Sequence, residues 1–159
     1  MRRTVLTAAA VFALDQITKW AVVWQMDLAG RGVIEVAPPF LTFRMAWNRG
    51  VNFGLFAGEE ATRWALTGLA LAISVWVLIW IRREGGAFAQ LSAGLLTGGA
   101  LGNAADRVLY GAVADFLNMS CCGIENPYAF NLADIAIFAG AAGLVLSGGK
   151  TPGRRGRRP

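Results

Sequence analysis

The sequence contains no histidine, which removes both the commonest general base and the commonest protein ligand for metal ions. Its only two cysteines, Cys121 and Cys122, are neighbours. Adjacent cysteines bridge each other only with strain, and their spacing matches no zinc motif. We therefore expect neither a metal centre nor a cofactor, and we interpret the two thiols as incidental or as local packing groups.

Charged residues are also scarce. They make up 16% of the 159 residues, whereas 55% are hydrophobic and the mean hydropathy is +0.48. This length allows one domain, and the long apolar runs indicate an integral membrane protein. The net charge of +5 does not indicate a nucleic-acid partner, because the basic residues cluster at the ends of apolar runs, where topology signals lie.

Four apolar segments are each close to the roughly 20 residues that a membrane-spanning helix needs. We predict spans at about residues 4–26, 61–81, 87–105 and 130–148. The basic start and the first apolar run resemble a cleavable signal peptide. However, Asp15 and Lys19 interrupt this run, and the apolar region of a signal peptide does not carry an acid and a base.

The basic residues also predict the orientation in the membrane. Arginine pairs lie before the first span and after the second, and four more arginines lie in the tail 149–159, which we expect to be disordered near acidic headgroups. The positive-inside rule places all of them, and so both termini, in the cytoplasm. The loops 27–60 and 107–129 then face outward. We expect a single domain over residues 1–159 and a monomer in the bilayer.

One loop shows a period of two. Leu41, Phe43, Met45 and Trp47 alternate with more polar residues, which predicts a strand with one apolar face. The predicted fold is therefore an α-helical membrane protein with four transmembrane helices and a small extracytoplasmic β element between the first and second helices. In the third span, glycines recur every fourth residue and predict close helix packing, at Gly94, Gly98 and Gly102.

Three acids interrupt apolar surroundings. Asp15 lies four residues before Lys19, so the two share a helix face, and we predict a structural ion pair away from the outer polar surface. Asp134 lies near the start of the fourth span, where an ionisable group is costly and suggests function. Asp115 lies just upstream. A simple helix cap or bundle contact is the alternative role for Asp134.

Two close carboxylates cannot both ionise easily, so one keeps a proton and the pair offers both an acid and a base. Such a pair activates water against an amide bond. A Ser–Lys dyad is a second possibility, but no local motif joins Lys19 to Ser74, Ser92, Ser120 or Ser147. A third is a small transporter or proton-coupled channel that uses Asp15, Lys19 and Asp134.

Five short motifs occur in order along most of the chain: DQITK at 15–19, NRGVNFG at 48–54, GNAADR at 102–107, VADF at 113–116 and FNLAD at 130–134. Together they resemble the bacterial lipoprotein signal peptidases, or signal peptidase II. The resemblance implies an aspartic endopeptidase of the bacterial inner membrane, with its site at the outer face. It would cut a prolipoprotein just before its diacylglyceryl-modified cysteine, and it would be inhibited by the cyclic peptide globomycin.

The resemblance also implies residue roles. Asp115 and Asp134 match the catalytic aspartates. Four polar residues match positions around the substrate, namely Asn48, Asn103, Arg107 and Asn131. Three charged residues match positions that support the site, namely Asp15, Lys19 and Asp106.

The chain departs from the family pattern at three places. Ala104 and Ala105 stand where larger apolar residues are usual, and Asn52 stands where a small residue is usual. Glu125 and Asn126 replace an aromatic residue that often precedes the Pro127 region. These departures concern local packing and loop shape rather than the two aspartates.

Overall fold

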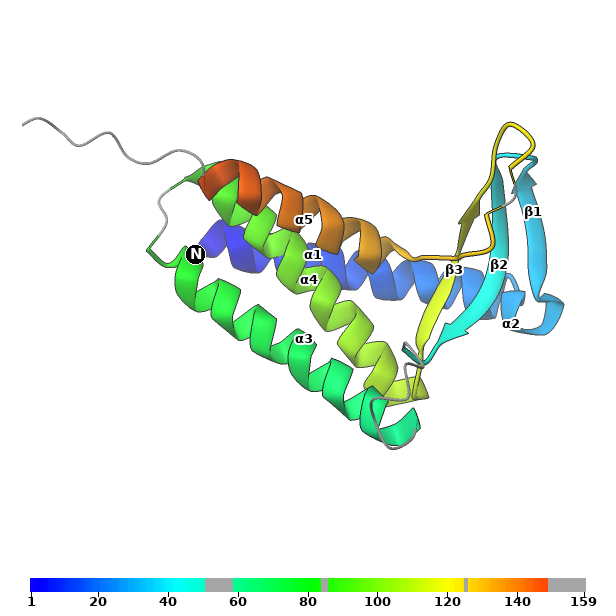
Figure 1. Ribbon diagram of the computed structural model, residues 1–159, viewed down its shortest axis with the longest axis horizontal. Helices are drawn as coiled ribbons and strands as arrows, with labels where there is room; N and C mark the ends of the chain where they lie inside the picture. The colour runs from blue at the N-terminus through cyan, green and yellow to red at the C-terminus, as the bar shows by residue number, and fades with distance from the viewer. Residues whose placement is uncertain (51–58, 84–85, 125, 149–159) are drawn as a thin grey trace, which may run out of the picture.

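The computed structural model describes residues 1–50, 59–83, 86–124 and 126–148. Within these ranges, long helices form a bundle and a three-stranded antiparallel sheet closes one end of it (Figure 1). The helices are α1 (Arg2–Lys19) with its π-helical continuation η1 (Trp20–Gln25), the short α2 (Leu28–Arg31), α3 (Glu59–Ile81), α4 (Ala87–Tyr110) and α5 (Leu132–Gly148). The strands are β1 (Val33–Ala37), β2 (Leu41–Asn48) and β3 (Val113–Met119).

Helix α4 is the centre of the bundle, because α1, α3 and α5 all pack against it. Its glycines allow this close approach. A Cβ at Gly98 would lie 2.6 Å from the carbonyl oxygen of Ala8, and one at Gly102 would lie 2.6 Å from Oδ2 of Asp15. The predicted small-residue face on the third helix is therefore confirmed. Helix α3, by contrast, packs on α4 with little contact to α1 or α5.

The outer surface of the bundle is strongly apolar. Phe138, Val145 and Leu146 of α5 are each at least 70% exposed. Such a surface suits contact with lipid rather than water. The helical segments Arg2–Gln25 and Glu60–Ile81 are long and apolar enough to cross a membrane, and the apolar Leu132–Ser147 is shorter.

The predicted third helix is too short. Helix α4 continues beyond residue 105 and ends at Tyr110, so Asp106 and Arg107 lie on its last turns rather than at the edge of a loop. Gly111 ends the helix in the left-handed region, at φ 78°, and its N–H bonds to the carbonyl oxygen of Arg107. A glycine reaches this conformation without the steric cost of a Cβ.

The prediction of the strand at residues 41–47 is confirmed by β2, but the β element is larger than expected. Strand β1 precedes β2, and β3 joins from the segment 108–129, which the sequence predicted to be a loop. Most of β3 is buried on both faces, so its sequence shows no alternation of apolar and polar residues. The sheet is therefore built from the connection before α3 and the connection after α4, and Asp115 lies on a strand.

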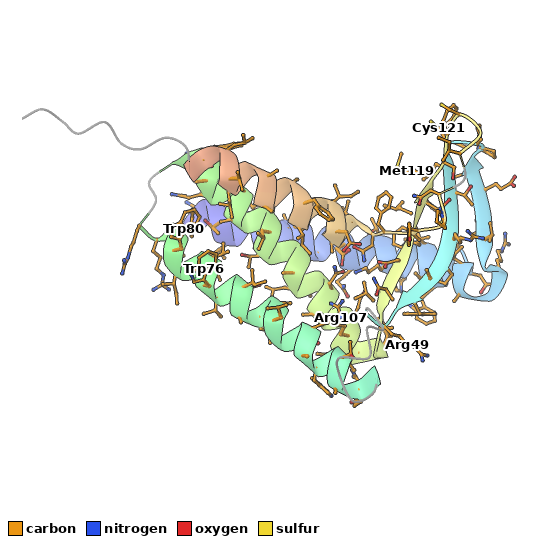
Figure 2. All side chains as sticks on the ribbon, viewed as in Figure 1. Arg49, Trp76, Trp80, Arg107, Met119 and Cys121 are labelled. Carbon is orange, nitrogen blue, oxygen red and sulfur yellow. The ribbon has the colours of Figure 1, made fainter. Side chains whose placement is uncertain are left out.

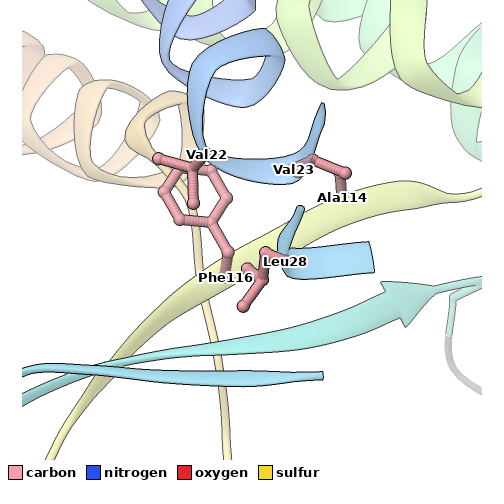
Figure 3. Packing of buried hydrophobic residues seen from close by; sticks show 5 residues of the cluster. All are labelled: Val22, Val23, Leu28, Ala114 and Phe116. Carbon is pink, nitrogen blue, oxygen red and sulfur yellow. The ribbon is translucent and has the colours of Figure 1, made fainter. Parts of the chain in front are cut away.

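An apolar cluster joins the sheet to the end of the first helix (Figure 3). Val22, Val23 and Leu28 pack against Ala114 and Phe116 of β3. Each such side chain contributes about 1.5–3 kcal/mol when it is fully buried. The cluster thereby fixes β3, and the acid that it carries, relative to the helices.

Candidate active site

Asn131 precedes the first turn of α5 and bonds reciprocally with Asp134. Its Oδ1 accepts the N–H of Asp134 at 2.9 Å, and Oδ2 of Asp134 accepts the N–H of Asn131 at 3.1 Å. This arrangement is a capping box, so the capping role that the sequence allowed for Asp134 is real. The carboxylate also accepts from Nδ2 of Asn103, at 2.8 Å, and it is only partly buried.

Asp115 lies opposite Ala46 in the pairing of β3 with β2 and is 3% exposed. Its Oδ2 accepts from Nδ2 of Asn48 at 3.0 Å, and its Oδ1 accepts from Nδ2 of Asn131 at 2.7 Å. Burial, and after it the charge of Asp134, raise the pKa of this carboxyl to about 6, against the opposing effect of the two amide donors. The side chain is thus a buried acid that keeps its proton up to about pH 6.

Asn131 connects the two aspartates. Its side-chain amide bonds to Asp115, its backbone N–H bonds to Asp134, and Nδ2 also lies 3.1 Å from Oδ1 of Asn103. The backbone supports this junction, because Phe130 exchanges hydrogen bonds with Leu117 of β3. The structure therefore brings together the two acids and three of the asparagines, Asn48 included, that the sequence selected.

Arg107 lies beside this group, at the junction of helices and sheet (Figure 2). It interacts electrostatically with Asp115 and Asp134, and its Nη1 lies 3.4 Å from the carbonyl oxygen of Asn103. Its Nε is buried and has no hydrogen-bond acceptor among the described residues. This N–H donor is therefore available for a carbonyl or ester oxygen.

A second polar cluster surrounds Lys19. Its Nζ lies 2.7 Å from Oδ2 of Asp15, which confirms the predicted ion pair, and 2.8 Å from Oδ2 of Asp106. Both acids are fully buried. The prediction that the ion pair stands apart from the other polar residues is wrong, because Lys19 also pairs with Asp106 on the last turns of α4.

This second cluster also contacts the segments that carry the two aspartates of the first. Asp106 Oδ2 accepts the backbone N–H of Ala114, which precedes Asp115, at 3.1 Å. Asp15 Oδ1 accepts the backbone N–H of Ala133, which precedes Asp134, at 3.0 Å. Lys19 therefore holds two carboxylates that each anchor the backbone beside one aspartate of the first cluster.

The sequence analysis did not select two polar side chains in this region. Gln16 donates to Asp15 at 3.2 Å and to Asp106 at 3.0 Å, although it lies within the first motif. Arg63 donates to the carbonyl oxygens of Arg107, at 2.6 Å, and Val108, at 2.9 Å, and so caps the C-terminal end of α4. No local pattern marks Arg63, because its acceptors lie more than 40 residues away.

The Ser–Lys alternative finds no support in the described part of the chain. Ser74, Ser92 and Ser147 each donate to the carbonyl four residues earlier in their own helix, and Ser120 contacts Asn118. Lys19 is occupied by two carboxylates. The turn predicted after Asn48 includes residues 51–54, and these lie outside the described residues, as do Glu125 and the basic tail.

The polar site opens onto apolar surfaces. Asp134 lines a groove of about 540 Å³ along α5, together with Phe130, Ile135, Phe138 and Ala139. A second groove of about 310 Å³ runs between α3, α4 and α5 and reaches Asn103 and Arg107. A ligand with both a peptide group and acyl chains therefore has polar and apolar surfaces side by side.

Residues 7–148 match the family model for signal peptidase (SPase) II. The chain belongs to this family. It is 45% identical, over 141 residues, to the lipoprotein signal peptidase of Methylobacterium sp. (strain 4-46), a match that covers 88% of this chain and 84% of the relative. It is 40% identical over 149 residues to the lipoprotein signal peptidase of Rhodopseudomonas palustris (strain ATCC BAA-98 / CGA009), covering 91% and 90%.

The fold also matches solved structures. A bacterial membrane enzyme determined by the in meso method at 2.3 Å aligns with a TM-score of 0.77 and 27% identity, over 100% of this chain and 94% of that chain. Another, at 1.9 Å, aligns with a TM-score of 0.78 and 28% identity, over 92% of each chain. The helical bundle with its small sheet is thus the fold of a membrane enzyme.

Proposed function

We propose that this chain is an aspartic endopeptidase that removes the signal peptide from diacylglyceryl-modified prolipoproteins, cutting just before the lipidated cysteine. One observation carries the proposal. Asn131 bonds to Asp115 through its side chain and to Asp134 through its backbone, so two carboxyls share one network that contains amides but no bonded lysine. Membership of the signal peptidase II family supports the substrate class.

The two acids have different surroundings, which suggests different roles. Asp134 is partly exposed to a groove and lies in the first turn of α5, where a helix favours negative charge. It is the proposed base, which takes a proton from water as the oxygen attacks the scissile carbonyl carbon. Asp115 is the proposed acid, which donates its proton to the carbonyl oxygen. Asp134 then passes the proton taken from water to the amide nitrogen, and a hydroxyl of the tetrahedral intermediate returns a proton to Asp115. The C–N bond breaks, which yields a carboxylic acid and an amine and restores both aspartates.

The surrounding residues position the substrate in this scheme. Asn48, Asn103 and Asn131 hold the two carboxyls at their present geometry. Arg107, with its unused buried Nε–H, is the proposed donor to a substrate carbonyl or glycerol ester. The apolar grooves beside Asp134 and Arg107 would accept the acyl chains from the bilayer. Asp15, Lys19 and Asp106 support the site without taking part in proton transfer.

The proposal includes a topology of four transmembrane helices in a single domain, with both termini in the cytoplasm. Arg2 and Arg3 begin α1 and Arg82 and Arg83 follow α3, and both pairs lie at the end of the bundle opposite the sheet (Figure 1). The positive-inside rule orients that end toward the cytoplasm. The two acids would then lie at the outer face, where the lipid-anchored substrate arrives, and the enzyme would act as a monomer.

The test is cleavage by the purified protein. Detergent-solubilised enzyme is incubated with a diacylglyceryl-modified prolipoprotein, and the products are weighed by mass spectrometry. We expect a product that begins at the lipidated cysteine and no product from a substrate whose cysteine is replaced by serine. Ion or solute movement in liposomes without any cleavage would instead favour the transporter hypothesis, and cleavage at another bond would refute the proposed specificity.

A further inference from the structure

A groove lies on the flank of α3 that faces away from the proposed catalytic residues. Because α1 and α3 both pack on α4 but hardly on each other, the space between them forms an apolar groove of about 690 Å³. Small residues of α4, Ala104 and Ala105 among them, form part of its lining. The polar share of this lining is negligible, so the groove suits hydrocarbon chains.

A polar pocket of about 430 Å³ continues from the end of this groove. Val108 and Leu109 line the groove, and the next residue of α4, Tyr110, lines the pocket. Trp24, in the last turn of one candidate membrane-crossing segment, and Glu60, at the start of the other, line the same pocket. The pocket therefore lies at the level of the membrane–water interface, where phospholipid headgroups are found.

The pocket combines two cations with aromatic faces. Tyr110 lies between Trp24 and Trp47, with ring centroids 6.1 and 5.9 Å apart, and all three side chains remain at least 39% exposed. Arg49 lies at the same junction of helices and sheet as Arg107 (Figure 2) and lines the pocket. Aromatic faces attract ammonium groups, and guanidinium groups bind phosphate.

Arg63 and Glu60 complete this set of charges. The Arg63 guanidinium is fixed by the two carbonyls at the end of α4, and it lies 3.3 Å from the Glu60 carboxylate. The pocket thus presents two positive charges and one negative charge beside the three aromatic side chains. Its charge pattern complements a group in which a phosphate is followed by an ammonium.

We propose that this flank binds one zwitterionic phospholipid of the outer leaflet, at a site separate from the two aspartates. Arg49 and Arg63 bind the phosphate, and the ammonium lies against the aromatic side chains and Glu60. The acyl chains occupy the groove between α1 and α3. Bound in this way, the lipid fills the gap beside α3. The proposal rests on membrane insertion alone and holds whether or not Asp115 and Asp134 are catalytic.

Native mass spectrometry of the full-length, delipidated protein in detergent tests the headgroup. The protein is titrated with phosphatidylethanolamine, phosphatidylcholine and phosphatidylglycerol of identical acyl chains. We expect saturable binding of one phosphatidylethanolamine or phosphatidylcholine, and about tenfold weaker binding after Arg49→Gln, which removes one charge-assisted contact. The matched control is Arg44→Gln on strand β2, which precedes Arg49 and carries Arg44 outside the pocket; it should leave the affinity unchanged.

A second pair of variants tests the groove. Ala9→Phe inserts a ring into the groove lining, whereas Ala10→Phe places the same ring at the next exposed position of α1, outside that lining. We expect only Ala9→Phe to reduce binding of the zwitterionic lipids. Absence of saturable binding, a preference for phosphatidylglycerol, or equal effects within either matched pair would overturn the proposal.

Discussion

The molecule contains two pairs of aspartates at one end of its helix bundle, and they differ in what lies between them. Asp15 and Asp106 share a lysine, whose Nζ lies within 2.8 Å of both. Asp115 and Asp134 share an asparagine, whose amide donates hydrogen bonds but carries no charge. The charge of the first pair is therefore partly compensated by the lysine where the pair is buried, whereas the two carboxyls of the second pair repel each other and one of them holds a proton instead.

The two pairs are also coupled through the backbone. Asp106 and Asp15 accept the N–H groups of Ala114 and Ala133, the residues immediately before the two members of the second pair. The lysine-paired acids are thus placed to fix the strand that carries Asp115 and the helix that carries Asp134. We interpret the first pair, Asp15 and Asp106, as structural. We interpret the second, Asp115 and Asp134, as the pair that carries out the chemistry and call it the chemical pair. Four predictions examine this distinction.

The largest effect is expected at the proposed catalytic pair. Asp115→Asn and Asp134→Asn each keep the size and polarity of the side chain but cannot transfer the proton. Each should lower cleavage of the lipidated prolipoprotein by at least 10²–10⁴-fold, measured as product mass against time. The double variant should be scarcely worse than either single one, because the two acids act as a unit.

The control for this prediction is the folded state. Both variants should elute as the wild type does from a sizing column and should still bind globomycin, the inhibitor that the family resemblance implies. Near-normal turnover in either single variant would exclude the aspartic mechanism.

A smaller effect, on stability rather than on chemistry, is expected at the other pair. Lys19→Met leaves two buried carboxylates without their cation, and breaking a buried ion pair in this way costs about 3–5 kcal/mol. Thermal unfolding in detergent should detect the loss as a lower melting temperature. The double variant Lys19→Met with Asp106→Asn should recover part of it, because one unpaired acid is removed.

Arg44→Met is the matched control for charge removal, since Arg44 is exposed. It should leave the melting temperature unchanged. If Lys19→Met abolished cleavage while the protein kept its full stability, Lys19 would belong to the chemical machinery, and the distinction between the pairs would fail.

Much of this comparison was accessible from the sequence. Helical spacing predicts the Asp15–Lys19 pair. The apolar runs predict the long helices, and the alternation in residues 41–47 predicts β2. The resemblance to the family selected Asp115, Asp134 and the asparagines, and their mutual contacts are those of one site.

The rest depends on contacts between distant segments. The bond between Gln16 and Asp106 joins residues 90 positions apart, and no local pattern encodes it. Strand β3 was missed because burial on both faces removes the period of two. The predicted third helix ends too early because two charged residues, Asp106 and Arg107, indicate a polar loop when their partners on other elements are unknown. Tertiary packing, not propensity, determines these features.

The third prediction concerns the stability cost of the chemical pair. Between the ordinary aspartate pKa of 3.8 and about 6, folded Asp115 keeps a proton that the unfolded chain releases. The stability due to this group is therefore fully present below about pH 4 and is lost as the pH rises through about 6. Asp115→Asn should remove this loss, which is of order 3 kcal/mol.

The measurement is the difference in unfolding free energy between pH 4 and pH 8, so that any constant change in hydrogen bonding cancels. Asp115→Asn should lose less stability than the wild type between pH 4 and pH 8. Asp106→Asn, which changes one of the two acids paired with Lys19, should lower the stability at both pH values because Lys19 loses a charged acceptor. A wild-type-like pH dependence in Asp115→Asn would show that its carboxyl is not the buried acid described.

The smallest effect is expected from a change at Asn48, which contacts one member of the chemical pair, Asp115. Its amide donates to Asp115 Oδ2 and so favours the charged form of that carboxyl. If Asp115 must be protonated to act as the acid, kcat/KM of the wild type should fall as the pH rises through about 6. Asn48→Ala removes the donor, raises the pKa of Asp115 and should move this fall to higher pH. Thr42→Ala, on the same strand but outside the pair, should leave it in place. A move to lower pH would assign the titration to another group and would reverse the roles proposed for the two acids.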